Sequence, residues 1–242
     1  MNCLILAAGY GSRLRAISES KPLTPVAGVP LIERVVIAAR AAGADEFVVV
    51  TGHDAERLEA FLAGLRSRLG VELRSVPTAD WDRPNGFSVL AGADTIAGEY
   101  LLLMSDHLFD PDIARDLLAR GSRGAAVTLA VDRRLSGAML DIEDATKVEV
   151  DASGRIVRIG KTLDRYNAID TGIFLATPEL AQAIRAAVAD GASGSLSDGM
   201  QHLADRGQAL TMDVRARTWI DVDDPPRLVL AEDWLRVHEQ AC

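Results

Sequence analysis

The first residues of the chain contain an apolar run that ends in a glycine-rich loop. Residues 3–8 read CLILAA, and Gly9 and Gly11 follow them. An apolar run of this length bounded by glycine predicts a strand that is buried on both faces. Glycine lets the chain turn tightly, so backbone N–H groups after the strand can approach an anion. Because Arg13 and Lys21 add positive charge at the same end, we predict that this segment binds a triphosphate.

Two other glycine-rich motifs do not fit this loop. The dinucleotide fingerprint G-x-G-x-x-G requires a third glycine where this chain has Leu14. The P-loop string G-x-x-x-x-G-K-[ST] does not occur in the sequence. An ordinary glycine-rich turn between a strand and a helix, without a ligand, remains the alternative.

Apolar runs and helical patterns alternate along the first 131 residues. Further strands are predicted at 46–50, 71–76, 100–104 and 125–131, and helices at 30–40, 54–65, 112–119 and from 85 onward. Pro30 and Gly43 mark the start and stop of the first helix, and Asp54 is predicted to cap the second. This alternation predicts an α/β fold, with a Rossmann-like, mostly parallel mixed sheet flanked by helices and a site at the carboxyl ends of its strands.

The alternation breaks in the second half of the chain. Residues 147–151 and 155–159 alternate with period two around a turn at 152–154, which predicts a hairpin. A strand at 168–175, helices at 178–189, 196–206 and 227–238, and a strand at 208–216 complete the prediction. We expect one domain over residues 1–242, with a nucleotide-binding part (1–131) and an acceptor-binding part (132–242). The latter contains a small β insertion that lies over the sheet.

Composition excludes several classes of function. The net charge of -9 opposes a nucleic-acid backbone, so we expect no nucleic-acid partner. No run approaches the roughly 18 apolar residues that a membrane span needs. The N-terminus lacks the basic segment of a secretory signal, and Cys3 and Cys242 lie at opposite ends of the sequence. We therefore expect a cytoplasmic protein without a membrane span.

The glycine loop carries a family resemblance. The string L-A-A-G-Y-G-S-R-L at 6–14, followed by K-P-L at 21–23, resembles the signature of nucleotidyltransferases that make sugar nucleotides and related activated head groups. This resemblance implies a GT-A-like fold and a bound Mg²⁺. Its implied nucleotide-binding residues are Leu6, Ala7, Ala8, Gly9, Gly11, Ser12, Arg13, Lys21, Asn85, Gly86, Ser88 and Asp106.

Later motifs resemble one branch of that family. Residues 141–148, 159–161, 169–172 and 219–223 are similar to the CTP:inositol-1-phosphate cytidylyltransferases, which in some organisms are fused to a membrane phosphotransferase. The resemblance implies CTP and a phosphorylated polyol as substrates, CDP-inositol and pyrophosphate as products, and a functional link to a separate membrane enzyme. It implies an acceptor site formed by Asp141, Lys161, Asp170 and Thr171.

The chemistry of nucleotidyl transfer gives these residues roles. Two anions must meet, so cations are needed on both sides and a divalent ion between them. Arg13 and Lys21 would hold the triphosphate and Lys161 the acceptor phosphate, as the catalytic residues. Two carboxylates suit Mg²⁺, and Asp106 and Asp221 are the predicted metal ligands.

Ligand-free interpretations compete with several of these assignments. Asp106 at the end of an apolar strand is costly to bury without a cation, but it could simply cap a turn. Lys161 could be a solvated lysine at the end of a hairpin, and Asp170 could belong to a plain turn. We interpret Asp223 and Asp224 as an acidic cap of the last helix, and give His107 no catalytic role.

Other functions stay open on the sequence. One group contains cytidylyltransferases for phosphocholine or an aminoalkylphosphonate, and sugar-1-phosphate uridylyltransferases. A choline site needs an aromatic cage, for which Trp81, Tyr166 and Trp219 are the candidates. A nucleotide-binding regulator without catalysis belongs to a different class, and would be expected to lack a metal carboxylate or a phosphate cation.

Overall fold

In the computed structural model of the chain, which describes residues 1–137 and 141–239, the N-terminal apolar run forms the strand β1 (Asn2–Leu6) near the middle of a nine-stranded sheet. The other strands are β2 (Pro25–Val26), β3 (Val29–Pro30), β4 (Glu46–Thr51), β5 (Glu72–Pro77), β6 (Tyr100–Met104), β7 (His107–Phe109), β8 (Val127–Asp132), β9 (Lys147–Val150), β10 (Ile156–Gly160), β11 (Ala168–Ala176), β12 (Ala209–Asp213) and β13 (Trp219–Asp221). The α-helices are α1 (Leu31–Ala42), α2 (Ala55–Leu69), α3 (Gly86–Ala93), α4 (Pro111–Arg120), α5 (Glu179–Ala189), α6 (Leu196–Ala204) and α7 (Pro225–Glu239), with 3₁₀ turns η1 (Ser12–Leu14) and η2 (Lys21–Leu23).

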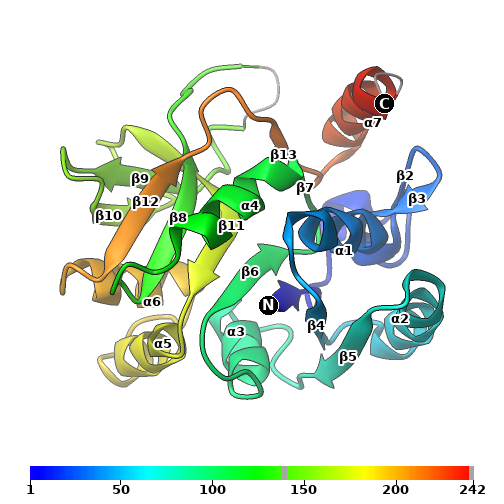
Figure 1. Ribbon diagram of the computed structural model, residues 1–242, viewed down its shortest axis with the longest axis horizontal. Helices are drawn as coiled ribbons and strands as arrows, with labels where there is room; N and C mark the ends of the chain where they lie inside the picture. The colour runs from blue at the N-terminus through cyan, green and yellow to red at the C-terminus, as the bar shows by residue number, and fades with distance from the viewer. Residues whose placement is uncertain (138–140, 240–242) are drawn as a thin grey trace.

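The sheet combines a parallel half with a mixed half (Figure 1). Its main path runs β10-β9-β11-β6-β1-β4-β5, and β8 and β12 branch from β11. β1 is parallel to β4 and β6, and β4 is parallel to β5, as the βαβ pattern predicts. β11 is antiparallel to its neighbours β6, β8 and β9. The predicted α/β class and mixed sheet flanked by helices are confirmed.

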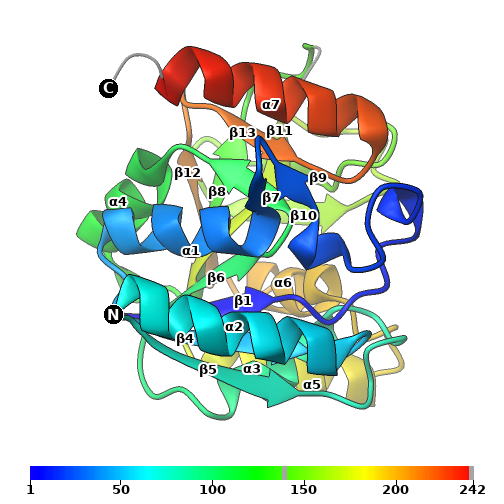
Figure 2. The ribbon, with the colours of Figure 1, turned by 90° about the vertical axis from the view of Figure 1, so that its right-hand side faces the viewer.

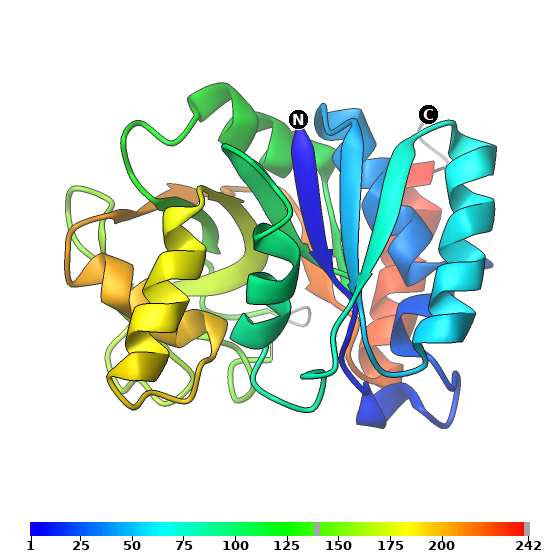
Figure 3. The same cartoon turned by 90° about the horizontal axis from the view of Figure 1, so that it is seen from below.

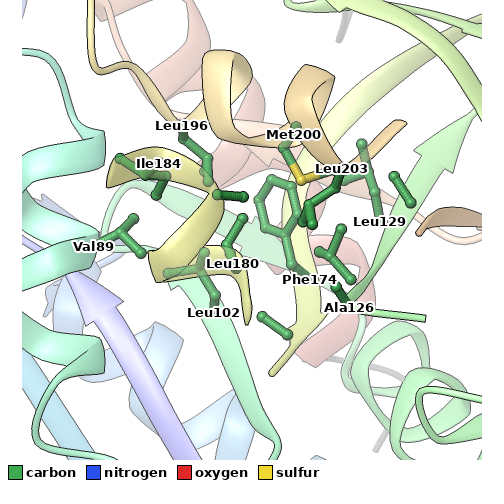
Figure 4. Packing of buried hydrophobic residues seen from close by; sticks show 14 of the residues in the cluster. Val89, Leu102, Ala126, Leu129, Phe174, Leu180, Ile184, Leu196, Met200 and Leu203 are labelled. Atoms are coloured by element: carbon green, nitrogen blue, oxygen red, sulfur yellow. The ribbon is translucent and has the colours of Figure 1, made fainter. Parts of the chain in front are cut away.

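Side chains of the central strands alternate between two apolar layers, because successive residues of a strand point to opposite faces. Leu4 and Leu6 of β1 belong to the layer under α3, α5 and α6, whose interlocking side chains Figure 4 shows around Phe174. Cys3 and Ile5 belong to the opposite layer, under α1, α2 and α4. In Figure 3, α3 and α5 stand side by side on the first of these faces. β1 is therefore buried on both faces, as predicted.

A third apolar cluster lies outside the sheet. Leu14, Ile220, Leu228 and Leu235 are buried in it, and it joins α7 to the ribbon formed by β7 and β13. Figure 2 shows α7 lying across the top of the molecule, above α1. This cluster fixes the ribbon against the glycine loop, where the site described below is built. None of the helices within residues 1–137 and 141–239 is long and apolar enough to cross a bilayer.

The structure corrects two details of the prediction. The hairpin β9–β10 does not lie over the sheet but extends its edge, because β11 is longer than its partner β6. β6 pairs with the last residues of β11, and β9 pairs with its first two, Ala168 and Ile169. Asp54 occupies the cap position of α2, but its side chain makes no capping bond there, and α2 continues to Leu69. The left-handed backbone of Asp54, at φ 56°, differs from the extended geometry typical of a capping residue.

Candidate active site

Two short strands place three potential metal ligands together. β7 pairs antiparallel with β13, so His107 lies directly opposite Asp221. Asp106 precedes β7, and its carbonyl accepts a hydrogen bond of 2.9 Å from the N–H of Val222. One carboxylate oxygen of Asp106, one of Asp221 and a ring nitrogen of His107 all lie within 4.8 Å of one another. The structure thus brings together the two carboxylates that the sequence assigned to one metal ion.

The protonation states of this group depend on one another. Nδ1 of His107 lies 2.7 Å from the carbonyl oxygen of Thr171, and because a carbonyl can only accept, Nδ1 carries the proton. Burial lowers the pKa of His107, but the carboxylates of Asp221 and Asp106 raise it above its ordinary value. Burial raises the pKa of Asp221, but His107 and Lys21 lower it below its ordinary value. Without a divalent ion, a charged imidazole therefore compensates the two carboxylates.

Lys21 is largely but not fully buried beside the glycine loop. Its ammonium contacts the carboxylate of Asp106 and lies 2.9 Å from Oδ1 of Asp223. Burial lowers its pKa, but Asp106 and two further carboxylates raise it above the ordinary value, so Lys21 stays charged. A Cβ at Gly11, where φ is +61°, would lie 2.3 Å from Cβ of Lys21. Only glycine allows this loop to approach the lysine so closely.

Charged side chains continue from Lys21 across the cleft. Asp223 also contacts the guanidinium of Arg13, which lies 2.8 Å from Oδ2 of Asp144. Oδ1 of Asp144 accepts a hydrogen bond of 2.7 Å from Lys161. Hydrogen bonds from Lys161 and Arg13 hold the pKa of Asp144 below its usual range. We call this alternating series the ion-pair ladder: Asp106, Lys21, Asp223, Arg13, Asp144 and Lys161.

Two adjoining pockets meet at Asp106. The smaller, of about 250 Å³, is lined by Leu6, Ala7, Ala8, Gly9, Gly11, Lys21, Pro22, Trp81, Arg83, Asn85, Ser88, Met104, Ser105 and Asp106. The larger, of about 300 Å³, contains the rest of the ladder together with Asp141, Asp170, Asp221 and Arg227. Lys21, Asn85, Met104 and Asp106 line both. Ser12 and Gly86 line neither pocket, and Arg13 lines the larger one.

The start of α3 is held against the loop before α6. Oδ1 of Asn85 accepts a hydrogen bond of 2.9 Å from the N–H of Leu196. A Cβ at Gly86 would lie 2.2 Å from the carbonyl oxygen of Gly194, so glycine is required for this contact. Asn85 therefore faces both pockets from a fixed position, while Gly86 serves the packing between the two segments.

A bulge in β11 shapes one wall of the larger pocket. The register of β11 against β8 shifts between Asp170 and Phe174, and Gly172 within the bulge has a φ of +73°. Burial raises the pKa of Asp170 to about 6, although its carboxylate accepts a hydrogen bond of 2.8 Å from the N–H of Gly172. Thr171 differs from the other predicted acceptor residues. Its hydroxyl donates to the carbonyl of Ala130 at 2.8 Å, and it is absent from the described linings of both pockets.

The sequence interpretation gave no role in the site to three residues that the structure places there. Asp223 was read as a helix cap, but its carboxylate contacts Lys21 and Arg13. Asp224 does cap α7, since its Oδ1 accepts a hydrogen bond of 2.8 Å from the N–H of Arg227. Asp144 received no role, although it stands between Arg13 and Lys161. His107 was set aside as a neighbour of Asp106, but it faces both proposed metal ligands.

The donor set fits a divalent metal ion. Oδ1 of Asp221 is buried and accepts no hydrogen bond within the described residues, which is unusual for a carboxylate oxygen. Asp106 presents one oxygen to this position, while its other oxygen contacts Lys21. Asp106 and Asp221 would hold the ion, since carboxylate oxygens suit hard divalent cations.

Comparison with known proteins identifies the family to which the chain belongs. The profile of the MobA-like NTP transferase domain matches residues 3–205. The chain is 38% identical over 231 residues to a bifunctional IPC transferase and DIPP synthase of Rubrobacter xylanophilus, covering 95% of this chain and 50% of the relative. It is 31% identical over 235 residues to the Aquifex aeolicus protein of the same description, covering 96% and 51%. The chain thus spans about half the length of these curated relatives.

A solved structure has the same fold. The inositol-1-phosphate CTP transferase from T. maritima superimposes with a TM-score of 0.82 at 26% sequence identity. The similarity covers 97% of this chain and 96% of that protein. The fold agreement therefore extends over both pockets and not only over the glycine loop.

Proposed function

Since the chain belongs to the family of MobA-like NTP transferase domains, we propose that this nucleotidyltransferase is a Mg²⁺-dependent cytidylyltransferase. It would join CTP and inositol-1-phosphate to give CDP-inositol and pyrophosphate. The observation that carries the proposal is the meeting of two pockets at one carboxylate, Asp106. One pocket is formed by the glycine loop, and the other by carboxylates and Lys161. The relatives named above support the choice of base and acceptor.

The transfer needs little more than positioning and charge compensation. An oxygen of the acceptor phosphate forms a bond to the α-phosphorus of CTP, and the bond from that phosphorus to the oxygen that bridges the α- and β-phosphates breaks. The electron pair of the broken bond leaves with pyrophosphate. A phosphate monoester is largely ionised near neutral pH, so no general base is required.

The chain's own residues would divide this work. Lys21, charged and part-buried beside the loop, would hold the α-phosphate, and Arg13 the outer phosphates. Lys161 would bind the acceptor phosphate from the end of the hairpin, with Asp141 and Asp170 near the polyol hydroxyls. Asp106 and Asp221 would hold the metal ion, which when bound neutralises charge on the phosphates.

The acceptor pocket favours a polyol over a quaternary ammonium. Of the three aromatic residues considered for a choline cage, Trp219 lines the larger pocket and Trp81 the smaller, while Tyr166 is in neither described lining. Carboxylates such as Asp141 and Asp170 are suitable acceptors for hydroxyl hydrogen bonds. We further propose that the reaction takes place in the cytoplasm and supplies a membrane phosphotransferase.

A matrix assay for pyrophosphate release tests the proposal. CTP, UTP, ATP and GTP are each combined with inositol-1-phosphate, phosphocholine, aminoethylphosphonate and glucose-1-phosphate, with Asp106→Asn as the inactive control. We expect the highest kcat/KM for CTP with inositol-1-phosphate, and CDP-inositol by mass spectrometry. If another pair gave a higher kcat/KM, that pair would replace CTP and inositol-1-phosphate as the proposed substrates. Binding of CTP without turnover on any acceptor would favour a regulator.

A further inference from the structure

His107 is held in one orientation by its surroundings. Its Nδ1–H donates to the carbonyl of Thr171 at 2.7 Å. A Cβ at Gly172 would lie 2.4 Å from Nδ1, so the bulge of β11 packs directly against the ring. The ring of Trp219 lies 5.9 Å away between centroids. Metal-binding histidines commonly donate their second N–H to a carbonyl in this way, which fixes both tautomer and direction.

The other ring nitrogen points at the proposed metal position. Nε2 of His107 lies 3.5 Å from Oδ1 of Asp221 and 3.7 Å from Oδ1 of Asp106. Oδ1 of Asp221 is the buried oxygen that accepts no hydrogen bond within the described residues. Oδ1 of Asp106 is the oxygen that the contact with Lys21 leaves available. All three atoms therefore face one another across a single small space.

We propose that His107 is a third protein ligand of the metal ion, through Nε2, and that it raises the affinity of the site for first-row transition ions such as Mn²⁺ relative to that for Mg²⁺. Mg²⁺ strongly prefers oxygen ligands and usually takes only one or two carboxylates from a protein. Imidazole is a better ligand for first-row transition ions. Three protein ligands would also allow the ion to bind before any nucleotide does. The proposal rests on the proposed metal site and not on the identity of the substrates.

The alternative role of His107 predicts the opposite behaviour. If the imidazole only compensates the charge of the two carboxylates, it competes with the metal ion for the same position. Removing it would then increase the affinity for both Mn²⁺ and Mg²⁺. If Nε2 is a ligand, removing it weakens Mn²⁺ binding far more than Mg²⁺ binding. A single substitution therefore separates the two roles by the sign of its effect.

His107→Asn is the most informative variant. The amide nitrogen of asparagine can take the place of Nδ1 and keep the hydrogen bond to Thr171, while the arm that carries Nε2 is removed. His202→Asn is the matched control, because His202 lies on α6, outside the described linings of both pockets. Circular dichroism and thermal melting in EDTA establish that the variants are folded.

Metal binding is measured by titrating Mn²⁺ into nucleotide-free protein and following free Mn²⁺ by electron paramagnetic resonance, with Mg²⁺ as competitor. We expect one Mn²⁺ per chain, bound at least about tenfold more tightly than Mg²⁺. His107→Asn should weaken Mn²⁺ binding by about tenfold or more, and His202→Asn should leave it unchanged. Equal or tighter Mn²⁺ binding by His107→Asn would overturn the proposal.

Pulsed electron paramagnetic resonance gives a readout that does not depend on the variant. A nitrogen ligand produces ¹⁴N modulation in the echo decay of bound Mn²⁺, so wild-type protein should show it. Its absence from bound Mn²⁺ would exclude His107 as a ligand even if His107→Asn failed to fold. Neither experiment contains CTP or an acceptor, so its result is separate from that of the turnover assay.

Discussion

Gly172→Ala tests whether the bulge of β11 holds the His107 ring. Gly172 has a φ of +73°, and an added Cβ would lie 2.4 Å from Nδ1 of His107 and 2.6 Å from Cε1. Alanine in a left-handed conformation costs about 1–2 kcal/mol. The methyl group also has to displace a ring whose hydrogen bond to Thr171 is part-buried. Loss of that bond, with its carbonyl left unpaired, costs about 1–3 kcal/mol more.

The substitution Gly28→Ala is the matched control for backbone strain. Gly28 has a φ of +79° in the turn between β2 and β3, and an added Cβ there meets nothing within 4 Å. Gly28→Ala should lower the free energy of unfolding only by the cost of the left-handed conformation, about 1–2 kcal/mol. Gly172→Ala should lower it by about 2–5 kcal/mol, because the cost of the lost hydrogen bond is added. The difference, about 1–3 kcal/mol, corresponds to several degrees in melting temperature for a chain of this size.

Urea unfolding in EDTA, followed by circular dichroism, measures both free energies. The same two variants are then titrated with Mn²⁺. Because the ring has to move, Gly172→Ala should also weaken Mn²⁺ binding by about tenfold, while Gly28→Ala should not. Equal losses of stability in the two variants, within about 0.5 kcal/mol, would show that the ring is not held by the bulge and would refute the reasoning.

Three further predictions concern the pockets. Asp221→Asn should lower kcat by about 100-fold or more while the circular dichroism spectrum is unchanged. Asp224→Asn, which keeps the cap of α7, should retain activity. If both variants lose the same activity, Asp221 is not a metal ligand. Lys161→Ala should raise the KM for the acceptor about tenfold or more, since a charge-assisted hydrogen bond is lost, and should raise the KM for CTP much less. Equal effects on the two KM values would contradict the role given to Lys161. Arg158→Ala, on the strand β10 that ends just before Lys161, is the control. For Asp170, the folded pKa of about 6 exceeds the unfolded value, so the ionised carboxylate opposes folding above pH 6 and stability is gained as the pH falls from about 6 to about 4. Asp170→Asn should therefore be more stable than wild type at pH 7.5, by up to about 3 kcal/mol, with the advantage shrinking toward pH 4 in urea unfolding with EDTA; a pH-independent difference would contradict the burial of this carboxylate.

Local patterns in the sequence were enough to predict most of the fold. The apolar run of β1, the helix between Pro30 and Gly43, and the period-two hairpin at 147–159 all form close to their predicted positions. Each is specified by side-chain periodicity and turn residues within a short window. The position of the hairpin at the sheet edge was not predictable, because it depends on the relative lengths of β6 and β11.

The sequence allowed several residues of the site to be predicted, but not which of them contact one another. Asp106 was recognised because it follows an apolar strand, and Asp221 because it lies in a motif that resembles the family's. The ribbon that brings them together consists of two strands of three residues each, too short for a period to be visible. The partners of Asp223 are 202 and 210 positions away along the chain, so no local pattern relates them. The orientation of His107 depends on the bulge at Gly172, which only the register of the folded sheet reveals.

The ion-pair ladder has a consequence for selectivity among anions. Each cation that would meet a phosphate already has a carboxylate counter-ion, so an incoming anion must displace that carboxylate instead of meeting a bare charge. A single inorganic phosphate or sulfate would gain little from such an exchange, because it replaces one good partner with another. A triphosphate, whose linked groups can replace several carboxylates in one event, gains the most. The free protein would therefore resist occupation by the small anions of its surroundings while remaining open to a nucleotide.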